Sequence, residues 1–217
     1  VDGGGVFYDF YPKEDYHYVF MIADVSGKGI SSAMFMMRAM SIIKASVQSH
    51  NDLAIAITEA NKNICENNEQ ELFVTAWIAI LDTATCKLEF VNAGHNPPVI
   101  NYGEDGGFEY LRTTPNLVLG GLLGIRYKSE KIQLPYNASI LLYTDGVTEA
   151  FNPRNEQYGE QRLLDCLNTL HRDYDSHDFP REMCDTVFRS VKDFEEGTRQ
   201  SDDITMVAIA YNTVDFF

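Results

Sequence analysis

The order of strand-like and helix-like segments is the feature that most constrains the fold of this chain. Apolar runs rich in β-branched and aromatic residues predict strands, and stretches without Gly or Pro whose apolar residues recur at helical spacing predict helices. Because the two kinds of element do not alternate regularly, a parallel βαβ sheet is not indicated. We expect an α+β architecture of mostly antiparallel sheets packed together with helices outside. The expected elements are a strand at 16–25, helices at 30–49 and 52–67, strands at 73–81, 87–92, 98–102, 108–112 and 139–144, helices at 160–171 and 180–194, and a strand at 204–211.

Length and composition favour one domain. The chain has 217 residues, enough for a sizeable core, and no Pro-, Gly- or Ser-rich linker divides it. We therefore predict a single domain over residues 1–217. The chain opens on Val1 and Asp2 followed by three glycines, so we expect truncation at the N-terminal edge, and an upstream membrane anchor or sensor stays open.

Charge and cysteine usage argue against several classes of protein. A net charge of −15 argues against a nucleic-acid partner, because duplex binding depends on Lys and Arg that neutralise phosphates. The cysteines show no paired C-x-x-C spacing, which argues against a zinc site and a disulfide framework and favours a reducing cytoplasm. No apolar run of the roughly 18 residues needed to span a bilayer is expected. The four cysteines are Cys65, Cys86, Cys166 and Cys184.

Four acidic residues lie where an apolar strand meets a Gly or polar turn: Asp24, Asp145, Asp202 and Asp203. Carboxylates gathered at strand ends suit Mg²⁺ or Mn²⁺, which prefer oxygen ligands. Two carboxylates roughly 5 Å apart repel by about 3 kcal/mol at an effective dielectric of about 20, so a cluster of three or four needs a cation. The alternative for any one of them is an ordinary turn former or helix cap.

Four ordered motifs carry a resemblance to a known family. They are Asp-Val-Ser-Gly-Lys-Gly at 24–29, Asn-Ala-Gly-His-Asn-Pro-Pro at 92–98, Thr-Asp-Gly-Val-Thr-Glu-Ala at 144–150 and Ser-Asp-Asp-Ile-Thr at 201–205. In order and spacing they resemble the SpoIIE/RsbU-type branch of the metal-dependent (PPM) protein phosphatases over nearly the whole chain. The resemblance implies a PP2C-like antiparallel β-sandwich flanked by helix pairs (α/β/β/α), and the removal of phosphate from Ser or Thr by a water held between two Mn²⁺ or Mg²⁺ ions.

The resemblance also implies roles for individual residues. Asp24 should bridge both metals, with the backbone carbonyl of Val25 as a further ligand, while Asp145 and Asp202 should complete the first metal site. Asp24, Asp145 and Asp202 are thus the expected catalytic residues. Asp203 should lie beside them and orient ligands or waters.

Two further residues of these motifs have competing interpretations. Lys28 could attract the substrate phosphate as a point charge, or it could be a solvated loop lysine. His95 has the pKa range of a general acid, but the neighbouring Asn-Pro-Pro marks a turn, and a structural hydrogen-bonding role is favoured.

One position departs from the family pattern. The family carries Gly-Gly-Asp-Phe-Tyr-Asp near the start of the domain, and its first Asp binds the second metal, whereas this chain has Val6 there. Val6 cannot bind a metal, so activity and the second site are in doubt unless Asp2 or Asp9 compensates or the residue is an alteration. Asp9 should face the opposite side of the strand from Val6, while Asp2, on flexible glycines, could reach at a cost in ordering entropy.

Three functions compete for this sequence. The first is a phosphatase acting on a phosphorylated protein, by resemblance a STAS-type anti-sigma-factor antagonist in a bacterial partner-switching pathway, controlled by an upstream sensor through the helix pair at 30–67. The second is a pseudophosphatase that binds a phosphoprotein, supported by Val6. The third, a cysteine phosphatase using the C-x5-R spacing of Cys166 and Arg172, is disfavoured because that segment is helical and lacks glycine.

Two further expectations concern surfaces. The Gly-rich segment 113–131 is a candidate mobile flap over the site. An exposed apolar face on the Met-rich helix at 30–49 would suggest a homodimer or a sensor contact.

Overall fold

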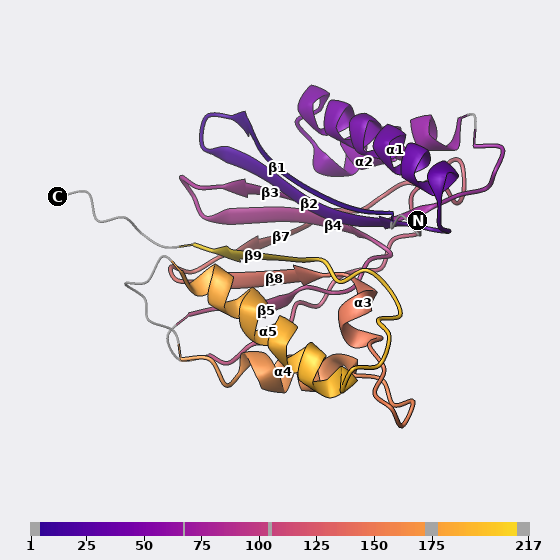
Figure 1. Cartoon of the computed structure of the whole chain (residues 1–217). Helices are drawn as coiled ribbons and strands as arrows, with labels where there is room; N and C mark the ends of the chain where they lie inside the picture. The colour runs from indigo at the N-terminus through magenta and orange to yellow at the C-terminus, as the bar shows by residue number, and fades with distance from the viewer. Residues whose placement is uncertain (1–4, 67, 104–105, 172–177, 212–217) are drawn as a thin grey trace. The chain divides into compact units, whose positions relative to one another are not determined.

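The computed structural model describes residues 5–66, 68–103, 106–171 and 178–211. The backbone divides into two compact units, which are described one at a time. Unit 1 comprises Val1–His95 and Thr113–Gln133, and unit 2 comprises Asn96–Arg112 and Leu134–Phe217 (Figure 1). Both units combine an antiparallel sheet with helices, so the expected α+β class is confirmed.

Unit 1 is a five-stranded antiparallel sheet with a helix pair on one face (Figure 1). The strand order is β1-β2-β3-β4-β7, and every neighbouring pair is antiparallel. The strands are β1 (Val6–Glu14), β2 (His17–Val25), β3 (Val74–Asp82), β4 (Lys87–Ala93) and β7 (Glu130–Gln133), and the helices are α1 (Ile30–Ser49) and α2 (Leu53–Cys65).

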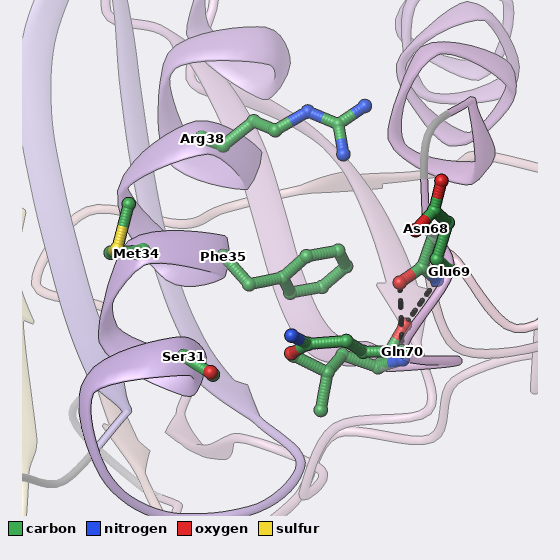
Figure 2. A pocket seen from close by; sticks show the side chains of 8 residues that line it. Ser31, Met34, Phe35, Arg38, Asn68, Glu69 and Gln70 are labelled. Atoms are coloured by element: carbon green, nitrogen blue, oxygen red, sulfur yellow. Dashed lines mark hydrogen bonds between the residues drawn. The ribbon is translucent and has the colours of Figure 1, made fainter.

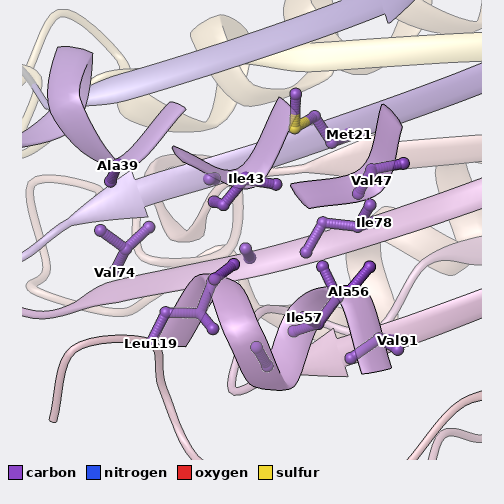
Figure 3. Close-up of a cluster of buried hydrophobic side chains, with 14 of the residues drawn as sticks. Met21, Ala39, Ile43, Val47, Ala56, Ile57, Val74, Ile78, Val91 and Leu119 are labelled. Atoms are coloured by element: carbon purple, nitrogen blue, oxygen red, sulfur yellow. The ribbon is translucent and has the colours of Figure 1, made fainter. Parts of the chain in front are cut away.

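The core of unit 1 forms because the strands alternate and the helices are amphipathic. On β2, Val19, Met21 and Ala23 join one buried cluster, whereas Asp24 lies outside it. The helices contribute apolar residues at helical spacing, such as Ile43 and Val47 of α1 (Figure 3). This face of the sheet is therefore fixed by the helix pair, and Asp24 belongs to the other face.

The two helices of unit 1 have the predicted positions. α1 spans the 20 residues expected from the absence of Gly and Pro, and Asp52 caps α2 by accepting a 2.9 Å hydrogen bond from the Ile55 N–H. The expectation that no segment could span a membrane is corrected, because α1 has the length and mean hydropathy, 1.2, of a candidate span. Ala39 and Ile43 of α1 are buried in the core of unit 1, so one face of this helix packs against the sheet.

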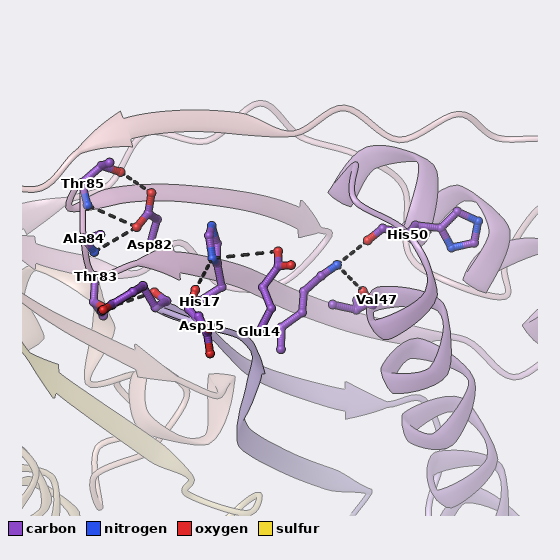
Figure 4. A network of polar contacts seen from close by, with 11 residues as sticks. Glu14, Asp15, His17, Val47, His50, Asp82, Thr83, Ala84 and Thr85 are labelled. Carbon is purple, nitrogen blue, oxygen red and sulfur yellow. Dashed lines mark hydrogen bonds and ion pairs between the residues drawn. The ribbon is translucent and has the colours of Figure 1, made fainter.

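Polar contacts fasten the ends of these elements (Figure 4). The ammonium of Lys13 on β1 donates to the carbonyls of Val47, at 2.7 Å, and His50, which satisfies free carbonyls at the end of α1. The Asp82 carboxylate closes the β3–β4 turn by accepting from the backbone and hydroxyl of Thr85. The predicted hairpin at this turn is confirmed.

Unit 2 is a four-stranded antiparallel sheet of order β6-β5-β8-β9. α5 packs against β9 and β8, and α4 packs against α5 (Figure 1). Leu163, Leu167, Met183 and Val187 from these two helices form a buried cluster with the sheet. The strands are β5 (Val99–Asn101), β6 (Glu109–Tyr110), β8 (Ser139–Tyr143) and β9 (Met206–Ala210), and the helices are α3 (Asp145–Thr148), α4 (Gly159–Leu167) and α5 (Phe179–Glu195).

Candidate active site

Asp145 lies at the point where a buried strand turns into a short helix. All five residues of β8 are buried, and Thr144 caps α3, of which Asp145 is the first residue. The carbonyl of Asp145 accepts a 2.7 Å hydrogen bond from the Glu149 N–H, which closes the turn. The Asp145 side chain is partly buried, and its Oδ1 is shielded from solvent.

The segment carrying Asp202 and Asp203 is fastened directly beside Asp145. The Thr144 hydroxyl donates to the Asp203 carbonyl at 3.0 Å and accepts from the Thr205 N–H at 3.0 Å. Gly146 closes the contact: a Cβ at this position would lie 2.3 Å from the Asp203 carbonyl oxygen, so any side chain there would clash. The motifs at 144–150 and 201–205, far apart in the sequence, are therefore adjacent within unit 2.

Local hydrogen bonds also orient the Asp202 side chain. Its Oδ1 accepts from the Asp203 N–H at 2.8 Å, and the Asp202 carbonyl accepts from the Gln200 amide at 2.8 Å. The hydroxyl of Ser201 donates to the Glu149 carbonyl at 3.2 Å. The loop before β9 is thus held to α3 from both sides of Asp202.

Asp24 is the second-to-last residue of strand β2 in unit 1. It is paired in register with Val6 of β1 and with Thr75 of β3, and its side chain is partly buried. Gly27 and Gly29 follow with φ angles of 84° and 92°, a conformation that side-chain-bearing residues rarely adopt. These glycines let the chain reverse within five residues and enter α1.

Lys28 lies between these glycines and is exposed. Its predicted attraction for a substrate phosphate stays a prediction. Val25 is fixed in place because its N–H donates to the Gly5 carbonyl at 3.1 Å, and the ligand role expected for its carbonyl is likewise a prediction.

Val6 lies directly opposite Asp24 across the β1–β2 ladder. Directly opposed residues present their side chains on the same face of a sheet, so the position that a carboxylate would need is filled by an isopropyl group. Asp9 is on the other face, where its carboxylate forms a 2.8 Å ion pair with Lys44 of α1, as the alternation of the strand predicted. Asp2 lies outside the described residues.

His95 is buried in a hydrogen-bonded turn of unit 1. Its Nδ1 lies 3.0 Å from the Thr75 hydroxyl, and its N–H donates to the Asn92 side chain at 2.8 Å. The amide of Asn92 in turn donates to the His95 carbonyl at 3.0 Å. These contacts agree with the structural role favoured by the sequence. Thr75, which links His95 to the strand beside Asp24, was not predicted, and nothing in its local sequence distinguishes it.

The segment 113–131 is fastened to unit 1 at its centre, which corrects the expectation of a loop free to move as a flap. Leu119 is buried and exchanges two 2.8 Å backbone hydrogen bonds with Val74. The buried side chain of Asn61 accepts from the Gly120 N–H at 2.8 Å and donates to the Leu122 carbonyl at 2.9 Å. Leu122 itself remains exposed.

A cavity of about 400 Å³ lies in unit 1 between α1 and the segment after α2 (Figure 2). Phe35 and Leu72 supply apolar walls. Arg38 donates to the carbonyls of Asn63, at 2.8 Å, and Glu66, which satisfies the end of α2. The cavity is distinct from the acidic motifs.

Cys166 lies in α4 and its thiol donates to the Thr186 carbonyl at 3.7 Å. The predicted helical setting is confirmed, and helix-interior N–H groups are not available to cradle a phosphate. Arg172 lies outside the described residues.

The motifs imply a bound metal, and the side chains at these positions determine which metal would fit. Asp145 and Asp202, on adjacent segments of unit 2, offer only oxygen donors, which fit Mg²⁺ or Mn²⁺. Val6 offers none, so among the described residues the position that the resemblance assigns to the second metal has no carboxylate. Within residues 5–66, 68–103, 106–171 and 178–211, no group of three His, Cys, Asp or Glu side chains is arranged to hold an ion, so the ligand roles stay predictions.

The fold is that of PP2C-like phosphatase domains. The structure is similar to the SiaA-PP2C domain of Pseudomonas aeruginosa, with a TM-score of 0.80 and 20% identity over 96% of this chain and 80% of that one. It is also similar to the SpoIIE phosphatase domain with a regulatory fragment from Bacillus subtilis, with a TM-score of 0.77 and 20% identity over 96% of this chain and 58% of that one.

A family model described as Stage II sporulation protein E (SpoIIE) matches residues 14–212, so the chain belongs to the SpoIIE family. Among curated relatives, it is 26% identical to Protein IcfG of Synechocystis, over 96% of this chain and 36% of that protein. It is 25% identical to Phosphoserine phosphatase RsbP and 28% identical to Phosphoserine phosphatase RsbU, both of Bacillus subtilis. These matches cover 94% and 87% of this chain but only 48% and 54% of RsbP and RsbU.

Proposed function

We propose that this chain is a metal-dependent protein serine/threonine phosphatase. Membership of the SpoIIE family supports phosphatase chemistry, and two relatives are named phosphoserine phosphatases. The observation that carries the proposal is the contact of Gly146 with the Asp203 carbonyl, which places the Asp145 turn and the Asp202 loop side by side.

In this proposal the aspartates hold and orient rather than attack. Asp145 and Asp202 hold Mn²⁺ or Mg²⁺, and Asp203 orients ligands. By family resemblance, Asp24 of unit 1 is also a carboxylate metal ligand. When bound, the metal supplies an activated water and offsets charge on the phosphoryl oxygens. Lys28 attracts the phosphate of the substrate from its exposed turn, and no residue of the chain forms a covalent intermediate.

The proposed substrate is a phosphorylated partner protein, by family resemblance a STAS-type anti-sigma-factor antagonist in a partner-switching pathway. An upstream sensor would control the enzyme through α1 and α2. In support, the outer face of α1 carries exposed apolar side chains at helical spacing, Ile30, Met34 and Met37. The same face could serve a homodimer, and a cytoplasmic location stays a prediction.

A second candidate function is a phosphoprotein-binding module without turnover. The observation that favours it is the pairing of Val6 with Asp24, because it leaves the second metal position without a carboxylate.

Phosphate release from a phosphoserine peptide and a generic phosphomonoester, with and without Mn²⁺, tests the proposal. We expect Mn²⁺-dependent release by the wild-type chain and a loss of at least about 100-fold in Asp145→Asn, because metal activation contributes several kcal/mol. Asp185→Asn removes an exposed carboxylate of α5 and is the matched control. No release at any Mn²⁺ concentration, or full activity in Asp145→Asn, would reject the phosphatase and favour the binding module.

A further inference from the structure

A chain of polar contacts in unit 2 leads from a buried carboxylate to the backbone of Asp202. Glu195, the last residue of α5, is 4% exposed. Its Oε2 accepts a 2.7 Å hydrogen bond from the ammonium of Lys192. Its Oε1 is buried and has no hydrogen-bond partner among the described residues. Lys192 is therefore the partner of the Glu195 carboxylate. Because this carboxylate is buried, it cannot exchange Lys192 for water.

The ammonium of Lys192 has a second contact, on the loop that follows α5. It donates to Oε1 of Gln200 at 2.9 Å, and this bond fixes the Gln200 amide group with its nitrogen on the opposite side. That nitrogen donates to the Asp202 carbonyl at 2.8 Å. An exposed glutamine ordinarily samples many rotamers, but here both ends of its amide are engaged.

We propose that Lys192 and Gln200 are positioning residues that hold Asp202 in place beside Asp145. The inference rests on the proposed function, since it assigns Asp202 to the metal. Gln200 fixes the backbone of Asp202 from one side, and the Thr144 hydroxyl fixes the carbonyl of Asp203 from the other. With both carbonyls held, and Oδ1 of Asp202 accepting from the Asp203 N–H at 2.8 Å, both the backbone and the carboxylate of Asp202 are oriented.

Groups that orient metal ligands typically contribute 10- to 100-fold to metal affinity. Gln200 acts on the backbone of the ligand rather than on its carboxylate, so the expected effect is at the lower end, about 10-fold. A merely structural contact on the surface would change the stability of the metal-free chain and leave the affinity for metal unchanged.

The test is a calorimetric titration of the whole chain with Mn²⁺, together with thermal unfolding in EDTA. We expect Gln200→Ala to raise the dissociation constant for Mn²⁺ about 10-fold, with little change in metal-free unfolding because the side chain is exposed. Gln161→Ala removes another exposed glutamine of unit 2, one that donates to Asp165 at 2.8 Å, and should bind Mn²⁺ like the wild type.

Lys192→Met should weaken Mn²⁺ binding by a similar factor, and Lys192→Arg, which keeps the donor, should restore most of it. Lys62→Met removes a lysine from another i,i+3 pair, with Glu59 in α2, and is the matched control. Because Lys192→Met leaves Glu195 buried without its cation and could unfold the chain, Gln200→Ala decides the outcome.

Equal Mn²⁺ affinity in Gln200→Ala and Gln161→Ala would overturn the inference. If Asp145→Asn nevertheless abolishes Mn²⁺ binding, the proposed function stands and only the positioning role is lost. If the wild-type chain itself binds no Mn²⁺, both fail together.

Discussion

The predicted metal ligands are divided between the two units, and within each unit their surroundings differ in how well they suit a metal. In unit 2, Asp145 and Asp202 lie on adjacent segments that are fixed by Thr144, Gly146 and Gln200. In unit 1, Asp24 is paired in regular register with strands on both sides, but the residue opposite it on β1 is Val6.

This comparison shows that the backbone around a site can be regular while one of the expected ligand side chains is absent. The ladder around Asp24 has regular antiparallel register from Val6 to Pro12, and the glycine turn into α1 is intact. By the family resemblance, a single side chain rather than a change of fold separates unit 1 from the expected second metal position. Four predictions probe this contrast, beginning with the largest expected effect.

Ile43→Ala tests whether the intact frame of unit 1 depends on the helix pair behind it. Ile43 is fully buried in the unit 1 core, and removing it should lower the free energy of unfolding by about 3 kcal/mol. Trp77 of β3 is the single tryptophan, so its fluorescence during urea unfolding reports on unit 1. Met183→Ala is the matched core deletion in unit 2, and a smaller effect of Ile43→Ala than about 1 kcal/mol would contradict the assignment.

Val6→Asp should convert the unit 1 part of the site into a metal position. The new carboxylate would oppose Asp24, and repulsion of about 3 kcal/mol at roughly 5 Å should lower the stability of the metal-free chain. Mn²⁺ should reverse that loss and raise phosphate release by about 100-fold.

Tyr8→Asp places the same charge two residues along β1, on the same face and opposite Ile22, and is the control. If Val6→Asp binds the same number of Mn²⁺ ions as the wild type, the absence of a carboxylate at position 6 is not what limits metal binding.

Thr144→Val and Thr58→Val form a matched pair between the units. Each threonine hydroxyl donates to a carbonyl and accepts from a backbone N–H: Thr144 with Asp203 and Thr205, and Thr58 with Ala54 and Tyr127. Each valine should cost about 2 kcal/mol of unfolding free energy, because buried polar groups lose their partners. Only Thr144→Val should also weaken Mn²⁺ binding; equal Mn²⁺ affinity in the two variants would break the comparison.

The smallest expected change in stability concerns Asp82 in the β3–β4 turn. Asp82 lies at the opposite end of β3 from Thr75. The hydrogen bond from the Thr85 hydroxyl lowers the pKa of this carboxyl below its ordinary value of 3.8. A lowered folded-state pKa contributes stability above 3.8 that is lost as the pH falls through the folded pKa. Thr85→Val should therefore be less stable than wild type at neutral pH, and the difference should shrink under acid in urea unfolding. A constant difference would reject the linkage.

Local signals predicted most of the long and strongly patterned elements, although β1 (Val6–Glu14) was not among the expected strands. The limits of α1 follow from a stretch without Gly or Pro, and the Asp52 cap follows from residue type alone. β7 was missed because Glu130–Gln133 is too short and polar to alternate clearly, and it becomes a strand only by pairing with β4. α3 is a single turn, shorter than periodicity can detect.

The sequence singled out candidate metal ligands, whose ligand roles stay predictions, but not the contacts that support them. The aspartates stand out because each lies near the end of an apolar strand, Asp24 and Asp145 at a carboxyl end and Asp202 and Asp203 before β9. The place of Asp9 follows from simple alternation. The contacts of Gln200 and Thr144, and the fastening of Leu119 to Val74, join residues distant in sequence or depend on side-chain rotamers. No local pattern encodes them, which is why segment 113–131 was wrongly expected to be free.

The pairing of β8 with β9 also sets an order for synthesis on the ribosome. β8 and the Asp145 turn are synthesised before β9, the strand that pairs with β8. The loop that faces Gly146 and carries Asp203 also comes later in the chain. A nascent chain halted before β9 therefore carries Asp145 without its neighbours and leaves an open sheet edge that invites aggregation. Until the segment before β9 is synthesised, Asp145 therefore lacks the loop that carries Asp202 and Asp203.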